Sequence, residues 1–308
     1  MSAEVEFIED DATKYFVVND WVNHWGDPKE GSIQYMQIDK KNGYIYASLE
    51  YKGSQQAPAP SVDTHFARFT TAGVYVDSMI LQGGGHGSSF GLEFIADKPV
   101  LWTNLSDYSQ STYTAYVAKV PYQANKVIPF SDSSITKLTK SGYFGRINLD
   151  DANGKVLATH TNGDILVADK KDVLAGKWKT NYLSNVSNYG VRLEKQTLQS
   201  NVMDYPYVFF NTGNADQSDK QMVYCVNVIT KSLVFAHEYV YSTITNPLMR
   251  AEPQTVGILV NGKAKSLVHG FSTRMTAEAE HLDETLWLTP LTYRVDDTSV
   301  PSYPDEPS

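Results

Sequence analysis

The segment Gln82–Asn104, QGGGHGSSFGLEFIADKPVLWTN, sets the pattern for the rest of the chain. Four glycines surround His86, and glycine lets a backbone take positive φ and approach its neighbours closely. Phe90–Ile95 then gives an apolar run around Glu93, and a turn separates it from the buried strand predicted at Val100–Trp102. We therefore expect a tight loop that leads into the first two strands of a β-unit.

This unit recurs at a regular interval. Its second strand is expected to begin at Tyr44, Val100, Val156, Tyr207 and Ser266, so successive units start 51 to 59 residues apart. A period near 50 residues with four short strands is typical of propeller blades. The sequence therefore predicts an all-β fold, a five-bladed β-propeller with four short antiparallel strands per blade. A β-sandwich with coincidental spacing is the alternative.

The repeat divides the chain into three parts. Residues 1–31 form an N-terminal segment, residues 32–293 the propeller, and residues 294–308 a flexible tail rich in Pro, Ser and Asp. The fifth unit offers only three clear strands. We expect Lys14–Val18 to supply the fourth and to close the ring, which would remove an exposed sheet edge.

Three further assignments complete the secondary structure. We expect Lys126–Phe130 as the fourth strand of the second unit and Gly190–Glu194 as the first strand of the fourth unit. Met275–His281 is the one helix-like stretch.

Composition and charge exclude several classes of partner. The net charge is −9 and the chain has no long Lys/Arg block, so we expect no nucleic acid partner. No stretch approaches the roughly 18 apolar residues of a membrane span. The N-terminus has neither the basic nor the apolar region of a signal peptide.

We expect no metal and no cofactor. Cys225 is the single cysteine, which leaves no intrachain disulfide and no cysteine-based zinc site. The seven histidines are scattered, without ligand spacing. Asn148–Gly154, NLDDANG, has some calcium-loop character but lacks the closing Glu, and a hairpin turn explains it better.

Polar residues on the first strand of each blade are candidates for a ligand site, because these strands line the central channel of a propeller. They include Gln34 and Gln37 in the first unit and Asn148 in the third. The predicted ligand-binding set is His86, Glu93, Trp102, Arg146, Arg192, Glu252 and Gln254. The alternative is an ion-paired plug that holds the blades together, since unpaired buried charge is expensive.

A catalytic function of the same channel is the second hypothesis. Glu93 and Glu252 could supply the two carboxylates of a glycan hydrolase, and His86 could be the base of a lyase. No fixed spacing supports either assignment, so we assign no catalytic residue.

Aromatic residues in or beside loops are a further indication of carbohydrate binding, because sugar C–H faces stack on aromatic rings and binding residues concentrate on loops. They are Trp21, Trp25, Tyr51, Tyr108, Tyr122, Tyr143, Tyr182, Tyr189, Tyr205, Tyr241 and Tyr303. We expect about half of them to be packing residues.

The glycine-rich motif resembles that of a known family. GGGHGSSFGLE, followed by the strand VLWTN, is similar to the GGHG…IGLE…IW segment of the helveticin J / TagC-like proteins. Their propeller also occurs in receptor-binding proteins of phages of Gram-positive bacteria. The later AYVAKVPY and RAEPQTVGI are similar to strands of the same family. The resemblance covers roughly residues 32 to 292, and the motif positions are His86, Gly87, Gly91 and Glu93.

The resemblance implies a five-bladed propeller and a role at the Gram-positive cell surface. It implies non-enzymatic recognition of teichoic acid or another cell-wall polysaccharide, by a phage receptor-binding domain or a helveticin-like bacteriocin. The expected location is then the virion tail or the extracellular cell surface. Single sites of this kind are weak, and a homo-oligomer would supply avidity. The enzyme hypothesis stays the alternative.

Overall fold

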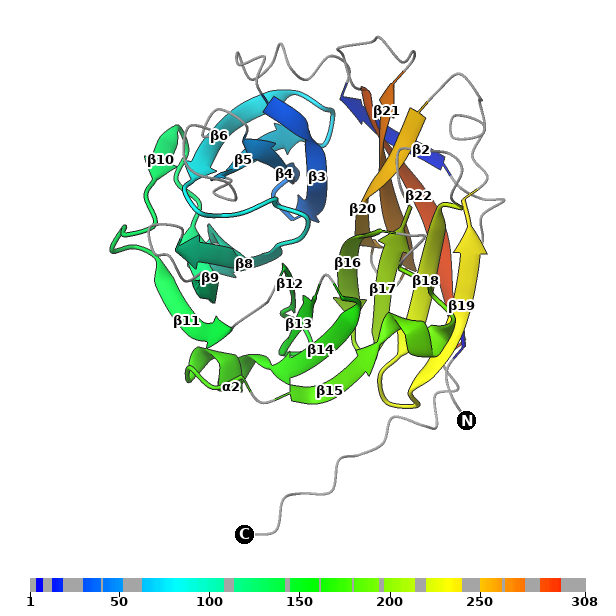
Figure 1. The fold of residues 1–308 in the computed structure, drawn as a ribbon. Helices are drawn as coiled ribbons and strands as arrows, with labels where there is room; N and C mark the ends of the chain where they lie inside the picture. The colour runs from blue at the N-terminus through cyan, green and yellow to red at the C-terminus, as the bar shows by residue number, and fades with distance from the viewer. Residues whose placement is uncertain are drawn as a thin grey trace.

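Five sheets lie around a central axis in the computed structural model, and together they form a five-bladed β-propeller (Figure 1). The structure describes residues 4–7, 13–18, 30–39, 41–51, 63–107, 114–141, 145–160, 162–178, 180–193, 197–213, 220–239, 250–261, 264–274 and 283–294. The predicted helix-like stretch Met275–His281 and the tail lie outside the described residues. Within the described part, no helix is long and apolar enough to cross a membrane.

The first three blades follow one another along the chain. Blade 1 contains β3 (Glu30–Asp39), β4 (Tyr44–Tyr51), β5 (Asp63–Thr70) and β6 (Tyr75–Leu81). Blade 2 contains β7 (Gly91–Ile95), β8 (Lys98–Asp107), β9 (Thr114–Pro121) and β11 (Thr136–Ser141). Blade 3 contains β12 (Arg146–Asp150), β13 (Lys155–Thr159), β14 (Asp164–Asp169) and β15 (Thr180–Asn185), with the short helix α2 (Lys170–Leu174) before the last strand.

The last two blades complete the ring. Blade 4 contains β16 (Leu198–Asp204), β17 (Tyr207–Thr212), β18 (Met222–Asn227) and β19 (Ser232–Glu238), and the 3-10 helix η3 (Val186–Tyr189) precedes it. Blade 5 contains β20 (Arg250–Asn261), β21 (Ala264–Arg274) and β22 (Asp283–Arg294). The second strands β4, β8, β13, β17 and β21 cover the positions from which the repeat was predicted, which confirms it.

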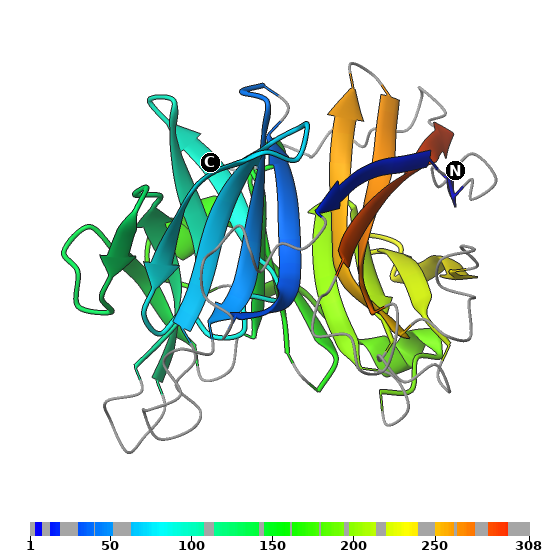
Figure 2. The same cartoon turned by 90° about the horizontal axis from the view of Figure 1, so that it is seen from above.

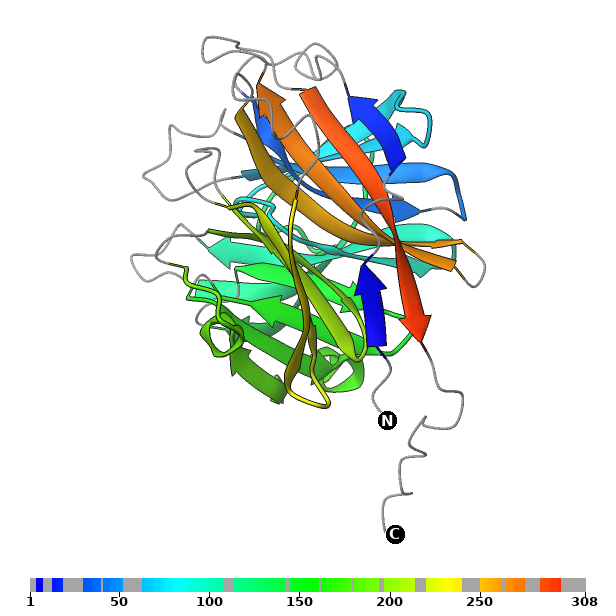
Figure 3. The same ribbon diagram turned by 90° about the vertical axis from the view of Figure 1, so that its right-hand side faces the viewer.

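The N-terminal segment closes the ring, as predicted. β2 (Thr13–Val18) pairs antiparallel with β22 over Glu284–Leu288, and β1 (Glu4–Phe7) pairs with its far end, Leu291–Arg294. Figure 3 shows both N-terminal strands beside β22. Blade 5 thus combines strands from both ends of the chain, and Figure 2 shows it next to blade 1.

The hydrophobic core is divided among the spaces between blades. Each pair of neighbouring blades encloses one apolar cluster. Phe66 and Leu101 belong to the cluster between blades 1 and 2, and Trp102 and Ile147 to the next. The remaining three clusters join blades 3 and 4, 4 and 5, and 5 and 1. Each blade packs against a neighbour on both of its faces. The middle strands therefore have apolar residues on both sides.

The fourth strand of blade 2 was predicted wrongly. Lys126–Ile128 forms β10, which pairs in parallel with β6 of blade 1, and the fourth strand of blade 2 is β11. Ile128 is 1% exposed within the cluster between blades 1 and 2, and Gln82 N–H donates to its carbonyl at 2.9 Å. Burial of this side chain holds β10 on blade 1.

The first strand of blade 4 was also predicted wrongly. The predicted stretch Gly190–Glu194 begins with Gly190, whose φ of +81° ends η3, and the inner strand is β16. β16 has the sequence LQSNVMD, which lacks the alternation of a surface strand because all but its last residue are buried. Its polar side chains are instead satisfied by hydrogen bonds, for example from Ser200 Oγ to Asn211 Oδ1 at 2.8 Å.

A polar network fills the centre of the ring. Asn148 Nδ2 donates to the Tyr35 hydroxyl at 2.8 Å and to Phe90 O at 3.1 Å. Ser89 Oγ lies 3.1 Å from both Ile147 O and Asn201 Oδ1. Tyr35, Asn148 and Asn201 are all 0% exposed, so they plug the channel at this level.

Candidate ligand-binding site at the mouth of the central channel

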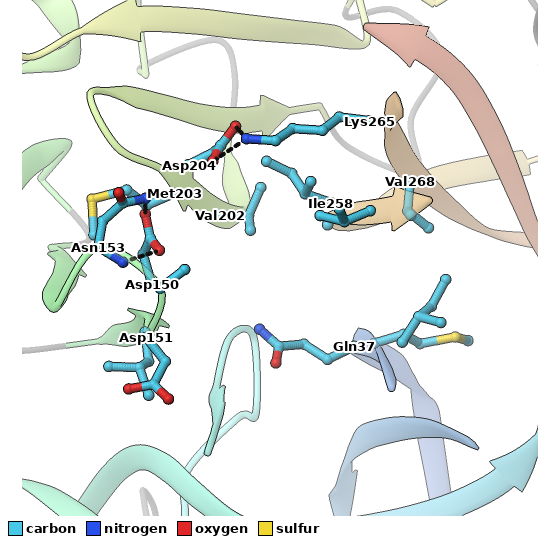
Figure 4. Close-up of a pocket in the computed structure, with 16 residues that line it drawn as sticks. Gln37, Asp150, Asp151, Asn153, Val202, Met203, Asp204, Ile258, Lys265 and Val268 are labelled. Carbon is cyan, nitrogen blue, oxygen red and sulfur yellow. Dashed lines mark hydrogen bonds and ion pairs between the residues drawn. The ribbon is translucent and has the colours of Figure 1, made fainter. Parts of the chain in front are cut away.

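A pocket of about 480 Å³ opens at one end of the channel. It is lined by the C-terminal ends of the inner strands β3, β12 and β16, and by β20 and β21 (Figure 4). Its apolar walls include Met36, Ile38, Leu149, Val202, Ile258 and Val268. Its polar groups are Gln37, Asp150, Asp151, Asn153, Asp204 and Lys265. The polar residues come from the hairpin ends, where the inner strand of a blade turns into the second.

The same hairpin turn occurs in blades 1 and 3. In blade 3, Asp150 Oδ1 accepts from the N–H of Asn153 at 3.1 Å and its Oδ2 accepts from Asn153 Nδ2 at 2.8 Å. In blade 1, Asp39 makes both bonds with Asn42, at 3.2 and 2.8 Å. A positive-φ glycine follows each Asn. Such Asp-to-backbone bonds fix a turn locally, so D-x-x-N-G is the turn motif of these blades.

Contacts within blade 3 and with the neighbouring blades hold the acidic groups of the pocket in place. Asp150 Oδ2 also accepts from Tyr205 N–H at 2.8 Å. Asp204 pairs with Lys265 Nζ at 2.6 Å, and Asp151 pairs with Lys170. Burial raises the pKa of Asp150, and the N–H donors of Tyr205 and Asn153 offset part of that rise. Asp150 thus remains an acceptor-rich group on the pocket wall without an ion-pair partner among the described residues.

The pocket combines an apolar surface with fixed acceptors and two amide side chains, Gln37 and Asn153. Gln37 points into it from β3 (Figure 4). Such a mixture suits a sugar ring, which has apolar C–H faces and a polar rim. Among the described residues, no group of three or more His, Cys, Asp or Glu is placed to hold a metal ion.

Glu93 and Trp102 lie between blades 2 and 3, not in a channel. Glu93 pairs with Lys119 at 2.8 Å and Lys170 at 2.7 Å, and accepts from Trp102 Nε1 at 2.9 Å. Burial alone would raise the pKa of Glu93, but these bonds lower it to about 2. Glu93 is therefore poorly suited to give or take a proton near neutral pH. Trp102 is 0% exposed and presents no ring face to a ligand.

The two predicted arginines do not line this pocket either. Arg146 donates through Nε to Gln199 O at 2.8 Å and through Nη2 to Leu198 O at 2.5 Å, so it bonds blade 3 to blade 4. Burial lowers the pKa of Arg146 to about 10. Arg192 is exposed in the loop after η3, because the inner strand starts later than predicted.

The glycine-rich motif is a scaffold between blades 1 and 2. Ser48 Oγ donates to Gly87 O at 2.6 Å, and Thr64 Oγ1 donates to Gly85 O at 2.7 Å. A Cβ at Gly83 would lie 2.4 Å from Ser106 O, so a side chain there is excluded. His86 is exposed on the outside of this loop. The glycine-rich motif therefore allows this loop to pack closely against the strands of blades 1 and 2.

The remaining predicted site residues lie on β20. Gln254 is 3% exposed at an irregularity of the β20–β21 pairing and does not line the pocket. Glu252 pairs in register with Ser272, and its side chain lies outside the described part. Thus none of the six predicted ligand-binding residues whose side chains the structure describes is part of this pocket. Of the other polar residues that the sequence analysis named as channel candidates, Gln37 lines the pocket.

The polar pocket residues that sequence reasoning missed are Asp150, Asp151, Asn153, Asp204 and Lys265. A signal for the first three existed: the D-x-x-N-G motif at 39–43 recurs at 150–154. Asp204 and Lys265 carry no comparable motif, because their pairing joins blades 4 and 5 across 61 residues of sequence.

Comparison with known proteins places this architecture in a family. Residues 32–281 match the model of the "Phage 5-bladed beta propeller receptor binding platform domain", which covers most of the chain. The chain belongs to this family of receptor-binding propellers.

Two known proteins are similar over much of the chain. The tail fiber of Staphylococcus aureus phage P68 matches at a TM-score of 0.70 and 17% identity, over 93% of this chain and 53% of the fiber. The Bacillus subtilis (strain 168) protein named "Putative major teichoic acid biosynthesis protein C" is 23% identical over 193 residues, 60% of this chain and 42% of that protein. The chain spans about half the length of either relative.

Proposed function

We propose that this chain recognises a cell-wall glycopolymer of a Gram-positive bacterium, teichoic acid or another surface polysaccharide, as part of a phage tail. Membership of the receptor-binding platform family supports receptor binding. The observation that carries the finer proposal is the channel-mouth pocket of about 480 Å³, with apolar walls and hydrogen-bonding groups fixed by neighbouring blades. The name of the Bacillus relative, which refers to teichoic acid, is consistent with it.

Recognition would begin with an uncharged part of the polymer. Gln37 and Asn153 supply amide groups, and Asp150 supplies a carboxylate that can accept from sugar hydroxyls. The apolar walls take the C–H face of the ring. With three carboxylates and one amine in its lining, the pocket repels a phosphate group.

The test is a pull-down with purified Gram-positive cell walls, before and after removal of teichoic acid, with released sugar assayed in the supernatant. Gln37→Ala removes the amide that points into the pocket. Gln82→Ala is the matched control, because Gln82 is exposed in the loop between β6 and β7 and outside the pocket. We expect Gln37→Ala to weaken binding and Gln82→Ala to leave it unchanged.

The outcomes separate the alternatives. Binding that disappears with the teichoic acid, without released sugar, supports the proposal. Binding that persists without teichoic acid moves the receptor to another wall polysaccharide. Release of sugar would favour the hydrolase or lyase hypothesis, and no binding to any wall preparation would refute the proposal. Killing of a related strain by the isolated protein would favour a bacteriocin.

A further inference from the structure

We propose that a second pocket, on the rim between blades 3 and 4, binds a phosphate-bearing polyol or sugar unit. This inference deepens the proposed function, on which its biological meaning rests. The pocket has a volume of about 350 Å³. Its lining residues come from β15 and η3 on one side and from the start of β19 on the other. Figure 1 shows β15 and β19 at the outer edge of the ring, away from its centre.

The lining of this rim pocket contains the groups that such a unit needs. Tyr189 is partly exposed and offers aromatic surface, and its hydroxyl contacts the hydroxyl of Tyr182, which is only 6% exposed. Asn188 Nδ2 donates to Ser184 Oγ at 3.1 Å, so the two polar side chains are aligned on one wall. Leu183 and Leu233 are 63% and 40% exposed, and they extend the apolar surface around the tyrosines. Aromatic and apolar surface beside hydroxyl and amide groups suits the carbon backbone of a polyol or sugar.

Lys231 adds a cation to this pocket. It is exposed, and within the described part of the chain it forms no ion pair. The turn that carries it is rigid, because Asn227 Oδ1 accepts from the N–H groups of Ile229 at 2.9 Å and Thr230 at 3.1 Å. The two residues that flank Lys231 in the sequence also contact each other, since Thr230 Oγ1 and Ser232 Oγ lie 2.7 Å apart. The ammonium group is thus available to a phosphate without breaking an existing pair.

Electrostatics assigns different parts of a polymer to the two pockets. The channel-mouth pocket presents Asp150, Asp151 and Asp204, and two of these are already paired with lysines. Among the described residues that line it, the rim pocket has a lysine and no carboxylate. A phosphate is therefore favoured at the rim and disfavoured at the channel mouth, although the whole chain carries a net charge of −9.

The experiment titrates the whole chain with sn-glycerol 3-phosphate and, separately, with glycerol, and follows binding by NMR of the tyrosine rings. Lys231→Gln removes the charge and keeps the length, and Lys231→Arg keeps the charge. Lys171→Gln is the matched control, because Lys171 is an exposed lysine of α2 outside the pocket. We expect glycerol 3-phosphate to bind more tightly than glycerol, and Lys231→Gln to weaken its binding by about threefold to fivefold. Lys231→Arg and Lys171→Gln should bind like the wild type.

The results distinguish this inference from the proposed function. Equal binding of glycerol and glycerol 3-phosphate, no binding of either, or an unchanged Lys231→Gln variant would overturn the rim site, whatever the wild type does with cell walls. Glycerol 3-phosphate binding that depends on Lys231, in a protein that binds no cell wall, would keep the rim site and refute the proposed function. If both hold, Lys231→Gln should also make wall binding weaker than that of Lys171→Gln.

Discussion

The Asp150 carboxylate accepts a 2.8 Å hydrogen bond from the backbone N–H of Tyr205, and this bond joins the inner hairpins of blades 3 and 4 at the edge of the channel-mouth pocket. The same carboxylate closes its own turn through two bonds from Asn153. Asp150 therefore has two roles at once: it fixes the turn and it sets the spacing of two pocket walls.

The first prediction separates these roles. Asp150→Asn replaces one accepting oxygen with a donor, so at least one of its N–H partners loses its acceptor. We expect a loss of about 1 to 3 kcal/mol in the free energy of unfolding, together with weaker wall binding. Asp39→Asn is the control, since it disturbs the equivalent turn with Asn42 but lies outside the pocket. Urea unfolding and the wall pull-down measure the two effects. Equal wall binding by both variants would contradict the placement of the site.

The second prediction concerns the buried ion-pair network of Glu93. Glu93→Gln leaves Lys119 and Lys170 without this carboxylate partner in a space that is mostly closed to water. Removing one partner from a buried pair is expensive, and we expect a loss of about 3 kcal/mol at pH 7. The exposed pair Lys220–Glu238 gives the control, because Glu238→Gln should change stability by less than about 1 kcal/mol.

The pH dependence of the Glu93 effect has a definite sign. The pKa of Glu93 in the folded protein is about 2, below its ordinary value of 4.5. Its contribution is therefore complete above pH 4.5 and is lost as the pH falls toward 2. The difference in unfolding free energy between wild type and Glu93→Gln should shrink over that range. A difference that stays constant from pH 7 to pH 2 would show that the ion pairs do not cause it.

The repeat could be predicted because turns and second strands carry local signals. Tyr44 and Val156 each follow a D-x-x-N-G turn, and the pattern depends only on residues a few positions apart. Ring closure was predicted by counting strands, since a fifth blade with only three strands lacks a fourth strand to cover its exposed edge. These features are set by short-range chemistry and by the cost of an open sheet edge.

The site could not be predicted in the same way, because its residues meet through tertiary pairing. Arg146 looked like a channel residue, yet its donors are used by the carbonyls of Leu198 and Gln199 on a strand that was itself misplaced by several residues. Trp102 was included in the ligand-binding set, yet it is 0% exposed in the cluster between blades 2 and 3. No local pattern distinguishes an aromatic ring that faces the next blade from one that faces solvent.

The third prediction tests the close approach of blades 2 and 3. A Cβ built at Gly91 would lie 2.4 Å from Leu149 Cβ and 2.7 Å from Leu149 N, and the latter atom belongs to a strand backbone that cannot move freely. Gly91→Ala should therefore cost at least about 3 kcal/mol of unfolding free energy. Gly43→Ala is the control: its φ is +73° but no atom lies within 4 Å of its Cβ, so strain of about 1 kcal/mol is expected. Similar losses in the two variants would argue against the tight crossing.

The fourth prediction concerns ring closure by the N-terminal strands. Deletion of residues 1–18 removes both β1 and β2 and exposes the edge of β22 along Glu284–Leu288. Unpaired edges recruit other strands, so we expect the shortened protein to self-associate and to melt more than about 5 °C lower than the full chain.

Deletion of residues 1–12 is the control, because it removes β1 alone and takes Val5 out of the cluster between blades 4 and 5. It keeps β2 on β22, so its melting temperature should fall less and it should not gain the tendency to associate. Light scattering measures the association of the three proteins, and thermal unfolding measures their melting temperatures. A 1–18 deletion that behaves like the full chain would mean that β22 does not need its N-terminal partner.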